Sequence, residues 1–283
     1  MKYQGIFYKE LLSRAGLDWH EFRAEGGLEF YDDINLLKAG INYSDATVTV
    51  SRRYKQEIMT PAFGERLDGV LRAIDQQGRL YGILNGIGET VNPATEEYIE
   101  HKYDASTVLA LKVENKQVLR RTIREGFGIA FDEPDNPDNP IIIFVGRIVP
   151  EKGINIIPQA VRGILRTNPD VQFVITGPGD RHAFGREIAE LESLNMEFPG
   201  RVASIITKRF MVSDKGVVLG TKIYAGGDLG IIPSMLAPCE LIDIICYKLG
   251  VVPVVHNIGG LADKMQEYDF ATHQGRGFAF DQF

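Results

Sequence analysis

Short apolar runs alternate with helix-like stretches over residues 141–283, and this alternation predicts a parallel sheet. The runs expected to be buried strands are 141–145, 171–175, 202–206, 229–232, 251–255 and 277–280. The stretches expected to be helical are 153–167, 181–194, part of 214–224, 239–249 and 261–268. Such alternation is typical of a parallel sheet with helices on both faces. Ligands bind these sheets at the carboxyl ends of the strands, so the glycine-rich turns there form the candidate site.

The first part of the chain has a weaker pattern. Within residues 1–86, helices are expected at 34–40 and 53–59, and strands at 47–50 and 80–84. These strands are too few to close a sheet, which indicates the tail of a larger α/β domain. Residues 87–140 are polar and helical in places. They end in a proline-rich solvated loop that lacks the glycine and glutamate spacing of a calcium loop.

Composition and charge exclude several classes of protein. The 283 residues are 44% hydrophobic and 24% charged, which favours a folded chain of about two domains. We find neither a signal peptide in residues 1–16 nor an apolar run of about 18 residues, so no membrane partner is expected. The net charge of −7 disfavours nucleic acid as a partner. Only two cysteines are present, which favours a reducing, cytoplasmic location.

Common cofactor motifs are missing or incomplete. The turn at 177–182 has the first two glycines of a dinucleotide fingerprint, but His182 replaces the third, and there is no Walker A sequence. The five histidines are scattered, so we expect no metal site and no cofactor. Cys239 and Cys246 are seven residues apart on one face of a predicted helix, and Cys246 is expected to be a small core residue.

Two glycine-containing turns carry candidate chemistry. Arg147 and Lys152 lie in the first strand-to-helix turn, where two cations beside backbone N–H groups suit a diphosphate. The alternative is a pair of surface cations. Gly259 and Gly260 would let the backbone approach a phosphate or a sugar, or they form only a tight turn.

These motifs, taken in order, resemble the bacterial glycogen synthases and plant starch synthases, which are retaining glycosyltransferases of the GT-B fold. Residues 146–153 match the family motif GR-x(4)-KG. The other matching segments are 3–7, 9–14, 29–31, 37–41, 49–51, 82–87, 92–95, 233–234, 238–239, 253–255 and 259–263, together with the single residues Asn35, Tyr54 and Leu241. The resemblance implies an α/β fold with the tail of an N-terminal Rossmann-like domain over 1–86. A nearly complete C-terminal nucleotide-sugar domain would follow over 87–283.

The resemblance also implies a reaction. Family members transfer glucose from ADP-glucose to the non-reducing end of an α-1,4-glucan without a metal, in the cytoplasm or, in plants and algae, the plastid stroma. By this analogy Arg147 and Lys152 are the catalytic residues that neutralise the leaving diphosphate. The substrate-binding residues would be Tyr224, Cys239, Glu240, Leu241, Gly259 and Gly260. A packing role for Tyr224 is an equal alternative.

Several positions depart from the family pattern. Ala237 replaces a glutamate that contacts the donor sugar, and Glu240 replaces a glycine whose backbone faces it. Lys264 replaces a threonine, and Gly88 and Val91 replace an aspartate and a tryptophan. The family's N-terminal Lys-x-Gly-Gly loop and its C-terminal helices are also missing from this sequence. We therefore expect impaired transfer, with a partner chain or self-association supplying the missing half-domain. The alternatives are a non-catalytic relative that binds nucleotide, glucan or a partner, and a truncated reading frame.

Overall fold

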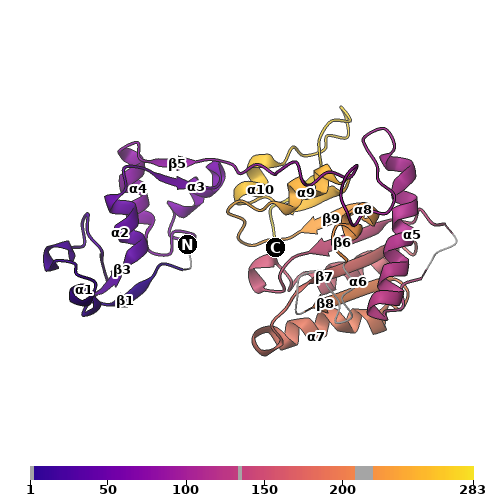
Figure 1. Ribbon diagram of the computed structural model, residues 1–283, viewed down its shortest axis with the longest axis horizontal. Coiled ribbons are helices and arrows are strands. Elements are labelled where there is room, and N and C mark those ends of the chain that lie inside the picture. Colours follow the sequence, from indigo (N-terminus) through magenta and orange to yellow (C-terminus); the bar gives the residue numbers. More distant parts are fainter. Residues whose placement is uncertain (1–2, 133–135, 208–218) are drawn as a thin grey trace. The chain divides into compact units, whose positions relative to one another are not determined.

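The computed structural model describes residues 3–132, 136–207 and 219–283. Two compact units make up the chain (Figure 1). One consists of Met1–Asn85 with Ala237–Cys239, and the other consists of Gly86–Leu236 with Glu240–Phe283. Each unit has its own strands and helices.

A six-stranded parallel sheet forms the centre of the second unit. Across the sheet the strands follow the order β11 (Phe278–Phe280), β10 (Val252–His256), β9 (Leu229–Ile232), β6 (Ile141–Val145), β7 (Gln172–Pro178) and β8 (Val202–Thr207). Every neighbouring pair is parallel. The predicted α/β fold with a parallel sheet is therefore confirmed.

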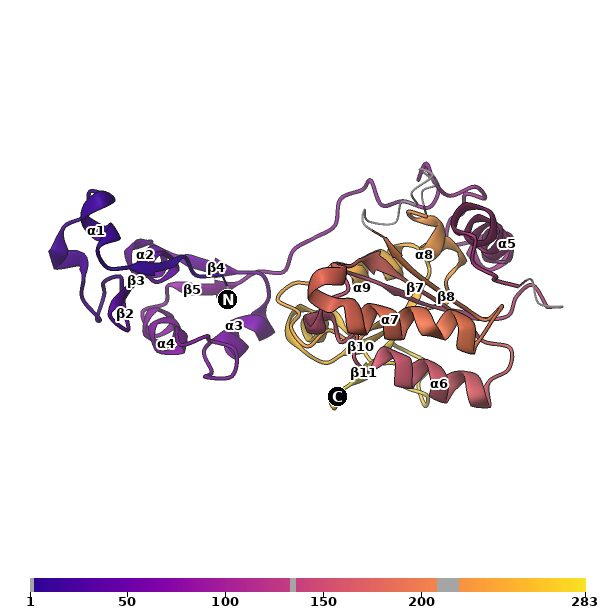
Figure 2. The same cartoon turned by 90° about the horizontal axis from the view of Figure 1, so that it is seen from below.

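Helices cover both faces of this sheet (Figure 2). Ile141, Ile143 and Val145 point to one face, where they pack with α5 (Val108–Phe127), α8 (Lys222–Gly226) and α9 (Ile242–Lys248). Ile142 and Phe144 point to the other face, against α6 (Ile157–Thr167) and α7 (Arg181–Glu197). Alternate side chains of a strand point to opposite faces, so a strand buried on both sides has a continuous apolar sequence.

Several helices begin or end at residues other than the predicted ones. Residues Pro150–Lys152 form a 3₁₀ turn that ends at Gly153, whose φ is +70°, so α6 begins only at Ile157. The helix α9 begins at Ile242, so Cys239 lies before it, and the predicted shared face with Cys246 was wrong. The last helix, α10, spans Gly259–Lys264 rather than 261–268. Of the helix expected within 214–224, residues 214–218 lie outside the described residues.

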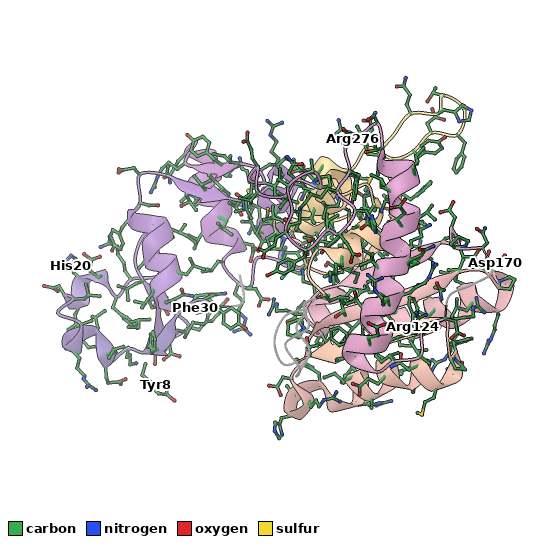
Figure 3. All side chains as sticks on the ribbon, turned by 45° about the vertical axis from the view of Figure 1, so that its right-hand side comes forward. Tyr8, His20, Phe30, Arg124, Asp170 and Arg276 are labelled. Carbon is green, nitrogen blue, oxygen red and sulfur yellow. The ribbon has the colours of Figure 1, made fainter. Side chains whose placement is uncertain are left out.

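The helix α5 is the main feature that the hydrophobic pattern did not reveal. Its buried face carries long cations. The Lys112 ammonium donates to the carbonyl oxygens of Tyr224 at 3.1 Å and Ala225 at 3.3 Å, and also to that of Gly227. Arg124, labelled in Figure 3, donates to the carbonyl oxygen of Phe131 at 3.4 Å near the end of the helix. Because these cations donate to backbone carbonyl groups, the helix can bury a face whose sequence is polar.

The first unit contains two small sheets. Strands β1 (Ile6–Tyr8), β3 (Asp33–Asn35) and β2 (Glu29–Phe30) pair antiparallel, and β4 (Thr47–Thr49) pairs parallel with β5 (Leu80–Gly82). The helices are α1 (Leu11–Arg14), α2 (Leu36–Tyr43), α3 (Arg52–Ile58) and α4 (Asp68–Gln76), with a 3₁₀ turn at Trp19–Glu21. Asn35 and Ser51 cap α2 and α3 through their side-chain oxygens. The parallel pair matches the strands expected near 47–50 and 80–84, whereas the antiparallel sheet was not predicted.

We predict that Lys112→Met destabilises the protein by about 3 kcal/mol, because each buried carbonyl group left without a donor costs about 1–3 kcal/mol. Chemical denaturation of the purified chain measures the change in the free energy of unfolding. Gln117→Met, an exposed position on the same helix, is the matched control and should change stability little. Equal stability of the two variants would contradict a structural role for the Lys112 ammonium.

Candidate functional site

A cavity of about 590 Å³ lies at the carboxyl ends of three strands of the second unit. It lies where β6, β7 and β8 end, the edge at which parallel sheets bind ligands. The lining residues are Arg147, Ile148, Val149, Pro178, Gly179, Asp180, Arg181, His182, Phe184, Ile206 and Thr207. The cavity therefore combines the turn that holds Arg147 with the Gly-Pro-Gly-Asp segment at the end of β7.

Close backbone packing fixes these two turns. A Cβ atom at Gly177 would lie 1.6 Å from the carbonyl oxygen of Gly146, so only glycine fits there. The Ile148 N–H donates to the carbonyl oxygen of Pro178 at 2.9 Å. Asp180 then caps α7, accepting from the N–H groups of His182 and Ala183. Gly177 therefore allows the end of β7 to pack closely against the turn after β6. Gly179 immediately precedes the cap of α7.

Arg147 is exposed at this cavity. Within the described residues its guanidinium makes no hydrogen bond or ion pair with another group. An unpaired guanidinium that lines a cavity is a suitable donor for a phosphate or carboxylate oxygen, because its five N–H groups match their geometry. The role predicted for Arg147 stays a prediction.

Lys152 lies outside that cavity and has an anionic partner. Its ammonium donates to the Glu240 carboxylate, and the Ser234 hydroxyl donates to the same carboxylate oxygen at 3.1 Å. The exposed fractions of the two charged side chains are 19% for Lys152 and 7% for Glu240. The structure therefore pairs one predicted phosphate-binding cation with one of the residues that depart from the family pattern.

The loops on either side of this ion pair are fastened together. The N–H of Met235 donates to the carbonyl oxygen of Glu151 at 2.9 Å. A Cβ atom at Gly153 would lie 1.9 Å from the carbonyl oxygen of Pro233. These backbone contacts hold the turn after β6 against the turn after β9, so the positions of Lys152 and Ser234 are coupled.

Glu240 is itself held by Lys264. The backbone φ of Glu240 is +46°, a left-handed conformation that favours glycine, the residue that the resemblance led us to expect there. The Lys264 ammonium donates to the Glu240 carbonyl oxygen and to the Asp243 carboxylate, the latter at 2.7 Å. Burial raises the pKa of Asp243, and the nearby Lys264 ammonium offsets only part of this rise. Glu240 and Lys264, both expected to depart from the family pattern, are thus in direct contact.

The remaining predicted residues lie in the core and in the segments after β9 and β10. Tyr224 is buried in the core beside α5, does not line the cavity, and has its pKa raised by burial. Cys239 and Leu241 flank Glu240, half-buried and 37% exposed respectively. Gly259 and Gly260 are buried at the start of α10, after β10. Their substrate-binding roles stay predictions.

Sequence reasoning missed His256. Its Nδ1 lies 2.8 Å from the carbonyl oxygen of Ser234, and its ring stacks on Phe280 with a centroid distance of 5.4 Å. His256 is the last residue of β10, and that position at a strand end is a signal that could have singled it out. Its contact links the turn after β9, which carries Ser234, to the next strand of the sheet.

Comparisons with known proteins agree with this architecture. Residues 1–73 match the family model described as starch synthase catalytic domain, and residues 128–209 match glycosyl transferases group 1. The glycogen synthase of Thermotoga maritima is 40% identical over 285 residues, and that of Desulforudis audaxviator is 37% identical over 286 residues. These alignments cover 99% and 100% of this chain. Over its whole length the chain is therefore similar to the glycogen and starch synthases.

A solved structure extends the comparison. The catalytic domain of starch synthase IV from Arabidopsis thaliana, bound to ADP and acarbose, matches with a TM-score of 0.82 and 29% identity. The match covers 99% of this chain and 54% of that one. The chain spans about half the length of the curated relatives it matches, 53% of the Thermotoga maritima protein and 52% of the Desulforudis audaxviator protein. The predicted resemblance and the GT-B fold are confirmed.

Two searches of the described ranges gave negative results. No group of three or more histidine, cysteine, aspartate or glutamate side chains in them is arranged to hold a metal ion. None of the helices in the same ranges has the length and apolar character needed to cross a lipid bilayer.

We predict that Lys264→Met costs about 3–5 kcal/mol at pH 7, because it leaves the buried Asp243 carboxylate without its cation. The folded-state pKa of Asp243 lies above its ordinary 3.8, so its contribution to stability is present at acid pH and is lost as pH rises through that pKa. The variant raises this pKa further, so its penalty should shrink between pH 7 and pH 4. Denaturation at both pH values measures it.

The double variant Lys264→Met with Asp243→Asn is the control for this effect. It removes the carboxylate along with the ammonium, so most of the pH dependence of the penalty should disappear. A penalty that is the same at pH 4 and pH 7 in the single variant would show that Asp243 is not responsible.

Proposed function

We propose that this chain is a glucosyltransferase of the glycogen and starch synthase type and that its second unit binds the nucleotide diphosphate of ADP-glucose. The observation that carries the proposal is the cavity at the ends of β6, β7 and β8, whose lining includes Arg147, a cation without a partner among the described residues. Its volume lies in the range of about 300–1,000 Å³ that small-molecule sites occupy. The starch synthase IV structure, bound to ADP and acarbose, supports ligands of this kind.

The chemistry follows from charge. When glucose is transferred to the end of an α-1,4-glucan, negative charge develops on the leaving diphosphate. Arg147 supplies fixed N–H donors and a positive charge at the cavity, which stabilise that charge without a metal ion. The two cysteines of the chain are too few for a disulfide framework, which suits a reducing compartment such as the cytoplasm.

We further propose that transfer is slow in this chain. Ala237 has no carboxylate to place beside the positive charge that develops on the sugar, where the family has a glutamate. Removing one preorganised electrostatic group typically costs about 10²–10³ in rate. The side chain of Glu240 also adds bulk and charge where the family has only backbone.

A non-catalytic nucleotide-binding relative is the second candidate, and one contact favours it. Lys152, which was expected to neutralise the leaving diphosphate, is already paired with the Glu240 carboxylate. Arg147 then remains available to bind the nucleotide. The chain has fewer charged groups that could stabilise the transition state of transfer, because Lys152 is paired and Ala237 has no carboxylate. Binding and transfer assays separate the two candidates.

We predict that Arg147→Ala weakens ADP binding by about 1.5–3 kcal/mol, the usual contribution of a hydrogen bond to a charged group. Isothermal titration of ADP into the two proteins measures the change. Arg166→Ala, at an exposed arginine of α6 outside the cavity lining, is the matched control and should bind ADP as the original chain does. Equal binding by all three proteins would overturn the assignment of the cavity.

We predict that the unmodified chain incorporates labelled glucose from ADP-glucose into glycogen slowly. The double variant Ala237→Glu with Glu240→Gly should incorporate it faster, since one change restores the carboxylate and the other clears the sugar position. Incorporation per hour over a no-enzyme blank is the readout. Rapid incorporation by the unmodified chain would refute the slow-transfer proposal, and ADP binding with no incorporation by either protein would favour the non-catalytic candidate.

A further inference from the structure

We propose that Glu240 is an internal anion that holds Lys152 and so sets the nucleotide preference of the site, removing the advantage that ADP would have over AMP. This inference rests on the proposed function, because it assumes that a nucleotide occupies the cavity beside Arg147. It adds a role for a residue that differs from the family pattern, and it concerns phosphate recognition rather than the sugar.

The sheet order places the contacts of Lys152 on the opposite side of β6 from the cavity. The cavity with Arg147 lies over β6, β7 and β8, whereas Lys152 is tied to Ser234 and Glu240 in the turn after β9, on the other side of β6. A nucleoside in the cavity would direct its phosphates past Arg147. The phosphate farther from the nucleoside is then the one that would reach Lys152.

The Glu240 carboxylate already provides what a phosphate would provide. Lys152 and the Ser234 hydroxyl both donate to one of its oxygens, so an ammonium and a hydroxyl converge on a single anionic atom. With only 7% of its side chain exposed, Glu240 has little access to water that could replace these donors. An incoming phosphate must break this pair, or leave Lys152 unused and lie beside a carboxylate that repels it.

The position of Glu240 is fixed at both its backbone and its side chain. Lys264 donates to its carbonyl oxygen and also pairs with the buried Asp243, while its side-chain carboxylate accepts from Lys152 and Ser234. A carboxylate anchored in this way does not leave the lysine at the small cost of an exposed surface ion pair. Lys264 is a positioning residue in this arrangement.

A double-variant cycle tests the proposal. ADP and AMP are titrated calorimetrically into the original chain, Glu240→Gln, Lys152→Met and the double variant. We expect ADP and AMP to bind the original chain with affinities within about twofold, and Lys152→Met to change ADP affinity by less than that. Glu240→Gln should strengthen ADP binding about tenfold, the contribution of one freed charged contact, with AMP unchanged. Adding Lys152→Met should abolish the gain.

Two further variants keep the test decisive. Glu125→Gln, at an exposed position of α5, removes the same charge elsewhere and should leave both affinities as they are. Glu240→Gly suits the left-handed backbone and should reproduce the gain in ADP affinity if Glu240→Gln folds poorly.

The possible outcomes separate this inference from the proposed function. If Lys152→Met weakens ADP binding tenfold in the original chain, or if removing the Glu240 carboxylate brings no gain, the inference is overturned while the nucleotide site stands. If no variant binds either nucleotide, the proposed function itself is overturned, and the inference with it.

Discussion

Burial of the central strands on both faces of the parallel sheet is the constraint on which the second unit depends. The strand β6 sends alternate side chains into two separate cores, so it must be apolar at every position from Ile141 to Val145. Polar groups that act on a ligand can then lie only beyond the ends of the strands. Arg147, Lys152, Ser234, Glu240 and His256 all follow carboxyl ends of strands or end one.

Backbone contacts between the turns make this edge a fixed surface. Gly177 approaches the carbonyl oxygen of Gly146 too closely for any side chain, and Gly153 does the same at Pro233. The first contact joins the turns after β6 and β7 around the cavity. The second joins the turns after β6 and β9 around the Lys152–Glu240 pair. The turn after β6 is therefore shared, and it presents Arg147 to the cavity and Lys152 to the carboxylate.

Much of the fold could be predicted because the sheet is buried on both sides, so its strands appear as short apolar runs between glycines and prolines. The helix α5 could not, because its buried face contains Lys112, Lys116 and Arg120, whose charged ends bond to carbonyl and carboxylate groups of distant segments. The first unit was predicted only in part, since antiparallel strands of two or three residues leave too short a pattern.

By itself the sequence determined the parallel sheet, the resemblance to the glycogen and starch synthases, and Arg147 and Lys152 as the cations of the first turn. The resemblance also led us to expect that Glu240 and Lys264 depart from the family pattern. Only the tertiary structure decided that these departures touch and that the Glu240 carboxylate lies on Lys152, 88 residues away along the chain. The physical reason is the order of the strands. Because β9 lies between β6 and β10, residues that follow these three strands meet at one edge, and no local pattern encodes that neighbourhood.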